Sequence, residues 1–258
     1  MAKPAQQVPI LMYHSISNGD SPTCISPGKF RTQMAMIAEH GWRVVPLRDV
    51  LLWHEGQIEL PEKAMAITFD DGFVDYQRSA HPVLEKHKFA STMFVPTLKV
   101  GEKEDWVGAG APPRTVMDWQ DVVELDKTRA EFAPHSRTHA DLTTLSALHC
   151  LDEVAGSKND METELDRQVE YFAAPYGRTN EAVQKTIAKH YTLAVGVEHG
   201  VATRDSDILN LPRIEMYYYQ NTKHWGDFLS GNGARYLAIR QMLRKVRRRL
   251  SGGESYAS

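Results

Sequence analysis

The sequence predicts a single α/β domain built around a barrel of parallel strands. Short apolar runs alternate with amphipathic segments along the 258 residues, as expected when each strand is followed by a helix that leads to the next strand. Several apolar runs are nearly continuous, which is typical of strands covered on both faces. Seven or eight such units fit this length, and a barrel of this kind carries its active-site residues at the carboxyl ends of the strands.

Strands are predicted where an apolar run is short and is bounded by turn residues. In chain order these runs cover residues 8–13, 42–45, 64–69, 91–95, 131–133, 171–174, 193–197 and 213–217.

Helices are predicted between these strands from apolar residues spaced three and four apart. Phe30, Met34 and Ile37 form one such stripe, and Gly41 ends that helix. Further helices are expected over residues 76–87, 119–125, 146–168 and 180–190, with Gly156 a weak point in the helix at 146–168. Residues 101–115 are rich in Gly, Pro and charge, which favours a mobile flap over a site.

Composition excludes several classes of protein. The formal net charge of -3 argues against nucleic acid as a main partner, because phosphate binding needs a basic face. Cys24 and Cys150 lack C-x-x-C spacing, so we expect two free thiols. The sequence has no run of about 18 apolar residues and no apolar signal region at its start. As written it predicts a cytoplasmic protein, and a periplasmic or extracellular protein whose leader had been removed would read the same.

Two adjacent carboxylates, Asp70 and Asp71, follow the strand predicted at 64–69 and precede Gly72. Like charges at a buried strand end repel, so the pair is favourable if a cation neutralises one member and leaves the other free for proton transfer. The same residues also suit an Asx turn that caps a helix.

Two histidines, His135 and His139, follow another short apolar run and stand four residues apart. This spacing puts both rings on one face of a helical turn, where they can bind one metal ion. With a strand-end carboxylate they make a set with open positions that suits hydrolytic metals, and water on such a metal has a pKa near 7. Either histidine alone would more often be a surface residue.

A third motif, Pro175-Tyr176-Gly177, ends the strand predicted at 171–174. A backbone N–H at such a strand end can stabilise a developing oxyanion. Taken alone, the motif is more typical of a plain turn.

Together and in this order, the three motifs resemble those of the polysaccharide deacetylase family, the carbohydrate esterases of family 4 that share the nodulation-deacetylase homology domain. The matching pieces are T-F-D-D-G at 68–72, H-S-x-x-H at 135–139 and P-Y-G at 175–177. Trp119 also stands where many relatives carry a tryptophan. The resemblance covers roughly residues 8–218 and implies a distorted (β/α) barrel of about seven strands.

The resemblance implies a role for each matching residue. Asp71, His135 and His139 correspond to the ligands of one divalent metal, and Asp70 to the general base. The backbone N–H of Tyr176 would share the oxyanion with the metal, and substrate contacts are expected from Tyr176, Pro175 and Trp119. Zinc is the expected ion, although cobalt, nickel, iron and manganese accept the same ligands.

The chain departs from the family pattern at two positions. Ala173 stands where many relatives carry an arginine that orients the base, and Arg213 is a candidate replacement at another strand end. The leucine-x-histidine that supplies the general acid is absent after Pro175. Residues 52–54 have these letters, but they precede the Asp-Asp motif.

Amide hydrolysis needs an acid because an amine leaves poorly unless it is protonated. His14, at the carboxyl end of the strand predicted at 8–13, is the candidate. This arrangement resembles the branch that deacetylates poly-N-acetylglucosamine, in which the acid histidine lies on the N-terminal side. A purely structural histidine is the alternative.

The segment 234–250 is basic and amphipathic. Its arginines and lysine accompany one apolar stripe of Ile239, Met242, Leu243, Val246 and Leu250. Such a helix can lie on an anionic membrane surface or meet an acidic partner, and the alternative is a helix docked on the barrel with a solvated basic face. We therefore expect a tail at 1–7, the barrel at 8–232, and this helix with a tail at 233–258, where residues 251–258 are expected to be disordered.

The sequence thus predicts a metal-dependent hydrolase that removes an acetyl group from an N-acetylated amino sugar of a polysaccharide or its lipid-linked precursor. One alternative is hydrolysis of another amide or ester, such as a formyl group, because the motifs report reaction type better than substrate. The other is a non-catalytic glycan-binding relative, against which the intact ligand set argues.

Overall fold

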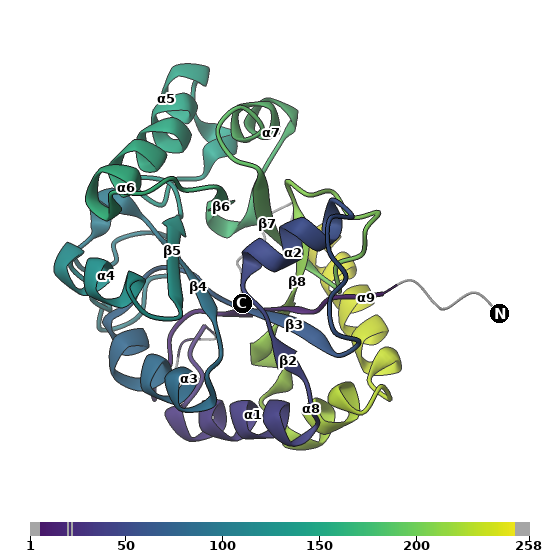
Figure 1. The fold of residues 1–258 in the computed structure, drawn as a ribbon. Helices are drawn as coiled ribbons and strands as arrows, with labels where there is room; N and C mark the ends of the chain where they lie inside the picture. The colour runs from purple at the N-terminus through teal and green to yellow at the C-terminus, as the bar shows by residue number, and fades with distance from the viewer. Residues whose placement is uncertain (1–5, 20, 22, 251–258) are drawn as a thin grey trace.

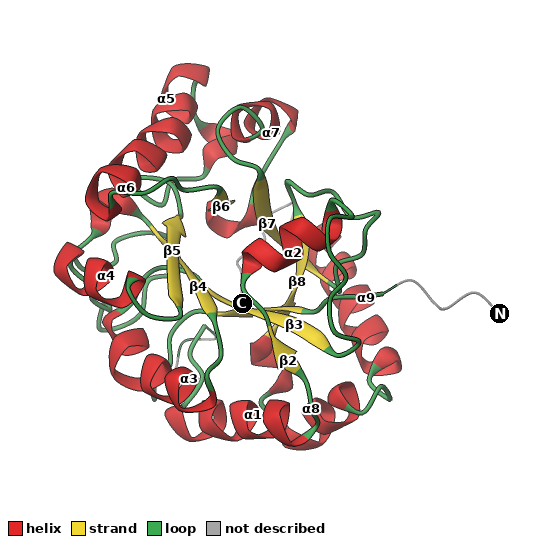
Figure 2. Ribbon diagram, in the orientation of Figure 1, coloured by secondary structure: helices red, strands yellow, loops and turns green. Residues whose placement is uncertain are grey.

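The computed structural model describes residues 6–19, 21 and 23–250. Its centre is one sheet of parallel strands, curled into a nearly closed barrel that helices surround (Figures 1 and 2). The strands are β1 (Ile10–Tyr13), β2 (Arg43–Val44), β3 (Ala64–Phe69), β4 (Ser91–Val95), β5 (Ala130–Pro134), β6 (Tyr171–Ala173), β7 (Leu193–His199) and β8 (Leu211–Glu215).

The helices lie mostly between successive strands, as expected for a (β/α) barrel. They are α1 (Pro27–Glu39), α2 (Leu47–His54), α3 (His81–His87), α4 (Trp119–Asp126), α5 (Ala147–Leu151), α6 (Ser157–Leu165), α7 (Glu181–Ile187), α8 (Thr222–Leu229) and α9 (Ala234–Leu250). Within the described ranges, none of these helices is long and apolar enough to cross a bilayer.

Strand order decides which residues meet at the mouth of the barrel. The strands run β5-β4-β3-β1-β8-β7-β6, and β2 pairs with β3 outside this path. β1 pairs with β3 so that Tyr13 lies opposite Phe69, and β4 pairs with β5 so that Val95 lies opposite Pro134. The residues that follow these strand ends therefore lie side by side at one end of the barrel.

The barrel has a seam between β5 and β6, the two ends of the strand order. Side chains make hydrogen bonds there with backbone groups on the unpaired edge of β5. Asp126 accepts a hydrogen bond from the backbone N–H of Phe132 (3.1 Å), and Arg167 donates to the Phe132 carbonyl (2.9 Å). Arg167 and Asp126 also form an ion pair at 2.6 Å. The pair thus supplies the hydrogen bonds that a neighbouring strand would otherwise make.

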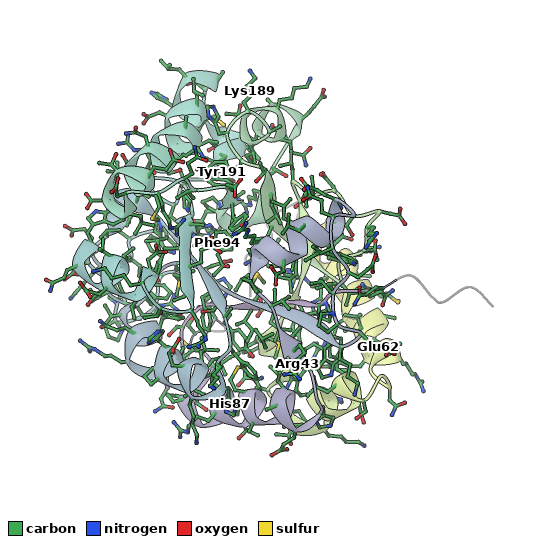
Figure 3. The ribbon with its side chains drawn as sticks, viewed as in Figure 1. Arg43, Glu62, His87, Phe94, Lys189 and Tyr191 are labelled. Atoms are coloured by element: carbon green, nitrogen blue, oxygen red, sulfur yellow. The ribbon has the colours of Figure 1, made fainter. Side chains whose placement is uncertain are left out.

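The core fills the barrel with aromatic and aliphatic side chains. All six residues of β3 are buried, as expected for a strand covered on both faces. The rings of Tyr13 and Phe69 stack at 5.3 Å between centroids. Figure 3 shows Phe94 near the middle of the strands, whereas Lys189 and Glu62 lie at the periphery. The barrel is therefore a packed core with its functional groups at one end.

The predicted strands are all present, with ends that differ by up to two residues. The last strand, predicted at 213–217, covers Leu211–Glu215 and is therefore displaced by two residues. The helix predicted at 146–168 is divided into α5, a π-helical turn (Asp152–Gly156) and α6. Gly156 lets the Arg137 side chain pack closely against this turn, since a Cβ on it would lie 2.7 Å from Cδ of Arg137.

The sequence analysis did not predict the helices α2 and α8. Cys24 and Cys150 are both buried and free, which confirms the expected thiols. Residues 1–5 of the expected N-terminal tail, and residues 251–258 with their expected disorder, lie outside the described residues.

Candidate active site

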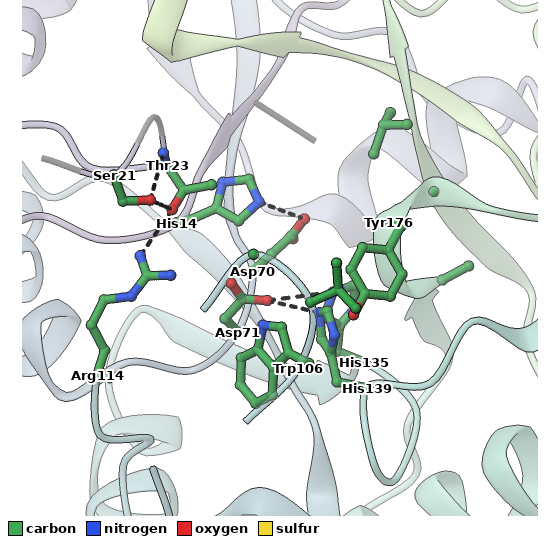
Figure 4. A pocket seen from close by; sticks show the side chains of 15 residues that line it. His14, Ser21, Thr23, Asp70, Asp71, Trp106, Arg114, His135, His139 and Tyr176 are labelled. Atoms are coloured by element: carbon green, nitrogen blue, oxygen red, sulfur yellow. Dashed lines mark hydrogen bonds and ion pairs between the residues drawn. The ribbon is translucent and has the colours of Figure 1, made fainter. Parts of the chain in front are cut away.

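A cavity of about 180 Å³ opens at the carboxyl ends of the strands. Its walls come from the ends of β1, β3, β5 and β6 and from the loop that precedes α4. Figure 4 shows its side chains, which include His14, Asp70, Asp71, Trp106, Arg114, His135, His139 and Tyr176. This is the end of a (β/α) barrel at which active sites lie.

Asp71, His135 and His139 form a buried group with the geometry of a metal site. Oδ1 of Asp71 lies 3.2 Å from Nε2 of His139 and 3.7 Å from Nε2 of His135. One ligand atom from each of the three residues lies within 4.8 Å of the others. Two imidazoles and one carboxylate fit a divalent ion such as zinc and leave positions open for substrate and water.

The surroundings of His135 prepare its ring to bind a metal. Its Nδ1 makes a 2.7 Å hydrogen bond with the carbonyl of Ala173 in β6. When Nδ1 donates this bond, Nε2 carries a free lone pair that points at Asp71. Histidines that bind metals commonly donate their other ring N–H to a carbonyl or carboxylate in this way. Burial lowers the pKa of His135 to about 4, so the ring is neutral at pH 7.

The prediction that both histidines lie on one helical turn was wrong. Ser136 and His139 have φ values of 60° and 62°, in the left-handed region, so the segment after β5 is a loop. The Ser136 hydroxyl accepts a hydrogen bond from the backbone N–H of His139 (3.1 Å) and closes the loop. The two rings nevertheless meet, with centroids 4.9 Å apart.

Glu153 holds this histidine loop from outside the cavity. The side chain is 8% exposed and lies in the π-helical turn between α5 and α6. Its carboxylate accepts hydrogen bonds from the backbone N–H groups of Arg137 (2.8 Å) and Thr138 (3.0 Å), and from the Thr138 hydroxyl (2.6 Å). Sequence reasoning missed Glu153, because nothing in a helical segment indicates which loop an acidic residue will contact.

Arg213 holds Asp70 in a two-point ion pair. Its Nη1 and Nη2 each lie 2.7 Å from one oxygen of Asp70, and its Nε donates to the carbonyl of Gly196. Both side chains are almost fully buried. Burial by itself raises the pKa of Asp70, but the charge and hydrogen bonds of Arg213 outweigh it, so the pKa lies below its usual value. Asp70 is therefore ionised at neutral pH.

His14 lies on the other side of Asp70, directly after β1. Its Nε2 is 3.9 Å from Oδ2 of Asp70, too far for a direct hydrogen bond, and the residue is 7% exposed. The two side chains are therefore close neighbours without a direct hydrogen bond between them. His54, whose Leu-x-His letters precede the Asp-Asp motif and for that reason do not fit the family pattern, ends α2 and makes a hydrogen bond with the carbonyl of Ser206, outside the cavity.

The turn Pro175–Gly177 brings Tyr176 to the cavity wall. Tyr176 has a φ of 59°, and its ring meets that of His139 edge-on at 4.7 Å. Gly177 is required here, because a Cβ on it would lie 2.2 Å from Cγ2 of Val197. Pro175 is buried and does not itself line the cavity.

The tryptophan at the cavity is Trp106, which the sequence analysis missed. Its ring stacks on His139 at 4.4 Å between centroids. Trp119, expected near the substrate, instead begins α4 and packs against the core away from the cavity. A tryptophan inside the loop at 101–115 is the signal that could have identified Trp106.

The loop that carries Trp106 is anchored at its base. Glu104 is 2% exposed and accepts hydrogen bonds from the backbone N–H groups of Gly110 and Arg114 and from the Arg114 guanidinium. Arg114 also lies over the ring of Phe73 at 3.9 Å. The flap expected here thus has a fixed base, and it presents Trp106 to the cavity.

A second hollow of about 430 Å³ adjoins the first on the side of Tyr176. Trp106, His139 and Tyr176 line both, and the second also contains the ion pair between Arg178 and Asp141 (2.6 Å). The two hollows together form a longer recess with an aromatic wall and a charged end.

Comparison with known proteins points to one family. The sequence model of the polysaccharide deacetylase family matches residues 57–195, more than half of the chain. The protein YxkH of Bacillus subtilis is 29% identical over 215 residues, 83% of this chain and 72% of that protein. The poly-β-1,6-N-acetyl-D-glucosamine N-deacetylase of Staphylococcus aureus is 26% identical over 170 residues, 66% of this chain and 54% of that enzyme.

Among solved structures, the Streptococcus pyogenes deacetylase PplD in complex with acetate is similar, with a TM-score of 0.71 and 25% identity. The match covers 82% of this chain and 92% of PplD. Fold, motif order and family match agree, and the chain therefore belongs to the polysaccharide deacetylase family.

Proposed function

We propose that this protein is a metal-dependent deacetylase that hydrolyses the acetamide of an N-acetylated amino sugar in a polysaccharide or its lipid-linked precursor. The observation that carries the proposal is the convergence of a metal-ligand set, a carboxylate and a histidine in one buried cavity. The family supports deacetylation as the reaction, and the site geometry supports its dependence on a metal.

Asp71, His135 and His139 would hold the ion. A divalent metal bound there polarises the acetyl carbonyl and makes water a better nucleophile. We propose zinc, since two imidazoles and one carboxylate are common zinc ligands in hydrolases, and cobalt, nickel, iron or manganese can use the same set.

Asp70 is the proposed general base, and Arg213 sets its position. The carboxylate is ionised, and its two-point contact with Arg213 prevents rotation, so an oxygen remains aimed at the cavity. It takes the proton of the water that attacks the acetyl carbon, while the backbone N–H of Tyr176 donates to the oxyanion that forms at the former carbonyl oxygen.

His14 is the proposed general acid. When the carbon–nitrogen bond breaks, the leaving amine needs a proton, and Nε2 of His14 supplies it. Figure 4 shows His14 across Asp70 from His135 and His139. The products are acetate and a free amino sugar, so the atoms of one water and one acetamide are accounted for.

The longer recess supports a substrate of more than one sugar. Trp106 and Tyr176 offer aromatic surfaces to the apolar faces of sugar rings, and the Arg178–Asp141 pair offers polar contacts for hydroxyl groups. The named activity of the Staphylococcus aureus relative supports polymers of N-acetylglucosamine as the first substrates to test.

Acetate release from N-acetylglucosamine oligomers tests the proposal. Wild type should lose activity with a chelator and regain it with zinc or cobalt. Asp70→Asn and His14→Ala should each lower kcat about 100-fold or more, because general acids and bases contribute roughly that much. His149→Ala, an exposed histidine in α5, is the matched control and should retain activity. Full activity in both site variants would contradict the assigned roles, and activity that resists chelation would contradict the metal.

A further inference from the structure

The helix α9 docks on the barrel through its polar side. The residues of α9 that are partly buried recur at helical spacing and are Tyr236, Leu237, Arg240, Gln241 and Arg244. The Arg240 guanidinium lies over the ring of Tyr218 at 4.6 Å, and Gln241 donates a 2.9 Å hydrogen bond to the carbonyl of His199 in β7. The Tyr236 hydroxyl donates to the carbonyl of Tyr218 (2.8 Å). Polar and aromatic groups thus make most of this contact.

The apolar stripe of α9 faces away from the barrel. Ile239, Met242, Leu243 and Val246 are 46%, 66%, 51% and 42% exposed. They stand three and four residues apart, so they lie on one face of the helix. Figure 1 shows α9 on the periphery of the molecule. This arrangement is the reverse of the ordinary one, in which a surface helix turns its apolar stripe to the core.

The charge around this stripe indicates what covers it. The segment 234–250 contains seven Lys and Arg residues and no Asp or Glu. Arg235 and Lys245 are exposed on the helix that bears the stripe. A second copy of α9 laid on the stripe would bring two strongly basic helices together, which is unfavourable. An anionic surface complements both the charge and the apolar stripe.

We infer that α9 binds the surface of an anionic lipid bilayer and lies in its interface. The apolar stripe enters the boundary between headgroups and acyl chains, and the basic residues meet the lipid phosphates. The contacts of Arg240 and Gln241 with the barrel hold the helix while its other side is in the membrane. This inference does not depend on the proposed chemistry, and it brings the enzyme to a membrane surface.

Co-sedimentation of the full chain with lipid vesicles tests the inference. Wild type should bind vesicles of equal parts phosphatidylcholine and phosphatidylglycerol, bind phosphatidylcholine alone weakly, and lose affinity as salt rises. Met242→Gln with Leu243→Gln should weaken binding about tenfold or more, because two half-exposed apolar side chains no longer enter the interface. Arg235→Gln with Lys245→Gln should weaken it about fivefold per charge.

The matched control lies on α5. Leu148 and Leu151 are 73% and 42% exposed, and Leu148→Gln with Leu151→Gln should leave vesicle binding unchanged. Acetate release from soluble oligomers should be equal in all these proteins, which separates a failure of this inference from a failure of the proposed function.

Three results would overturn the inference. One is wild-type protein that does not sediment with anionic vesicles. Another is equal sedimentation of wild type and the Met242→Gln, Leu243→Gln variant. The third is a wild-type dimer by light scattering that this variant converts to a monomer without any vesicle binding, which would assign the stripe to a second copy.

Discussion

At the scale of single residues, the site concentrates unusual backbone conformations. Asp71, His139 and Tyr176 all have φ between 59° and 76°, a region that side chains with a Cβ seldom adopt. Each such residue destabilises the chain by about 1 kcal/mol or more, so the surrounding structure has to hold it in place. Two of the three are proposed metal ligands, and the third is the proposed oxyanion donor, which supports a functional reason for the strain.

Substitutions of Arg213 should affect both activity and stability. Arg213→Lys keeps the charge but cannot hold both oxygens of Asp70, so the carboxylate should rotate away from its working position. We expect kcat/KM for acetate release to fall about 100-fold, with most of the loss in kcat. Arg213→Met should also destabilise the protein by about 3–5 kcal/mol, because it leaves a buried carboxylate unpaired.

The control for Arg213 is Arg129→Lys, which changes an exposed pair with Glu85. Exposed ion pairs contribute little, so stability and kcat/KM should both remain as in wild type. If Arg213→Lys showed wild-type kcat/KM, the positioning of Asp70 by Arg213 would have no part in the reaction.

At the scale of elements, the seam of the barrel lies between β5 and β6, the first and last strands of the sheet order. At the cavity, His135 joins β5 to β6 through its hydrogen bond with the Ala173 carbonyl. Further down, the Arg167–Asp126 pair satisfies the edge of β5 at Phe132. The strands at the seam are therefore connected by side chains, and one of these is a proposed metal ligand.

We expect protein stability to depend on pH through Glu131, which lies in β5 at this seam. Burial, above all, raises its pKa from 4.5 to about 7, against the opposing charge of Arg167. A carboxyl group whose pKa is higher in the folded state than in the unfolded state stabilises the protein at a pH below its unfolded-state pKa. This stabilisation is lost as the pH rises through its folded-state pKa. Glu131→Gln mimics the protonated form at every pH. The difference in free energy of unfolding between this variant and wild type should therefore shift by about 2 kcal/mol in favour of the variant from pH 4.5 to pH 8.

Denaturant unfolding of wild type and Glu131→Gln at both pH values measures this gain. Glu124→Gln replaces an exposed carboxylate of α4 and should show the same difference from wild type at both pH values. A Glu131→Gln difference that does not change with pH would mean that Glu131 titrates normally in the folded protein.

At the scale of the whole molecule, the proposed metal links parts of the chain that are far apart in sequence. Asp71 follows β3, whereas His135 and His139 follow β5, and β4 lies between them in the sheet. An ion held by all three binds the folded state and not the unfolded one, so it should stabilise the fold. At 100 times its dissociation constant, the gain is about 2.7 kcal/mol.

Thermal unfolding before and after zinc is added to chelated protein tests this linkage. Wild type should gain roughly 5 °C or more in Tm, and His139→Ala should lose most of the gain. His149→Ala should behave as wild type. A shift of equal size in His139→Ala would place the stabilising ion elsewhere in the molecule.

The sequence by itself determined the strands, the barrel and the chemistry-bearing motifs. Buried parallel strands leave nearly continuous apolar runs, and a strand end marks the mouth of a barrel, so Asp70, Asp71, His135 and His14 could be selected from local pattern alone. Arg213 is different, because it was proposed at a strand end as a replacement for the arginine of the family pattern, whereas it lies in the middle of β8 and reaches Asp70 from there.

Only the tertiary structure decided which partners those residues have. Strand order places Arg213 against Asp70, a left-handed loop, not a helical turn, joins His135 to His139, and Trp106 replaces Trp119 at the cavity. The same holds for α9, whose apolar stripe is visible in the sequence but whose outward orientation is not. Local patterns record which side chains share a face, whereas contacts between segments depend on packing that no local pattern records.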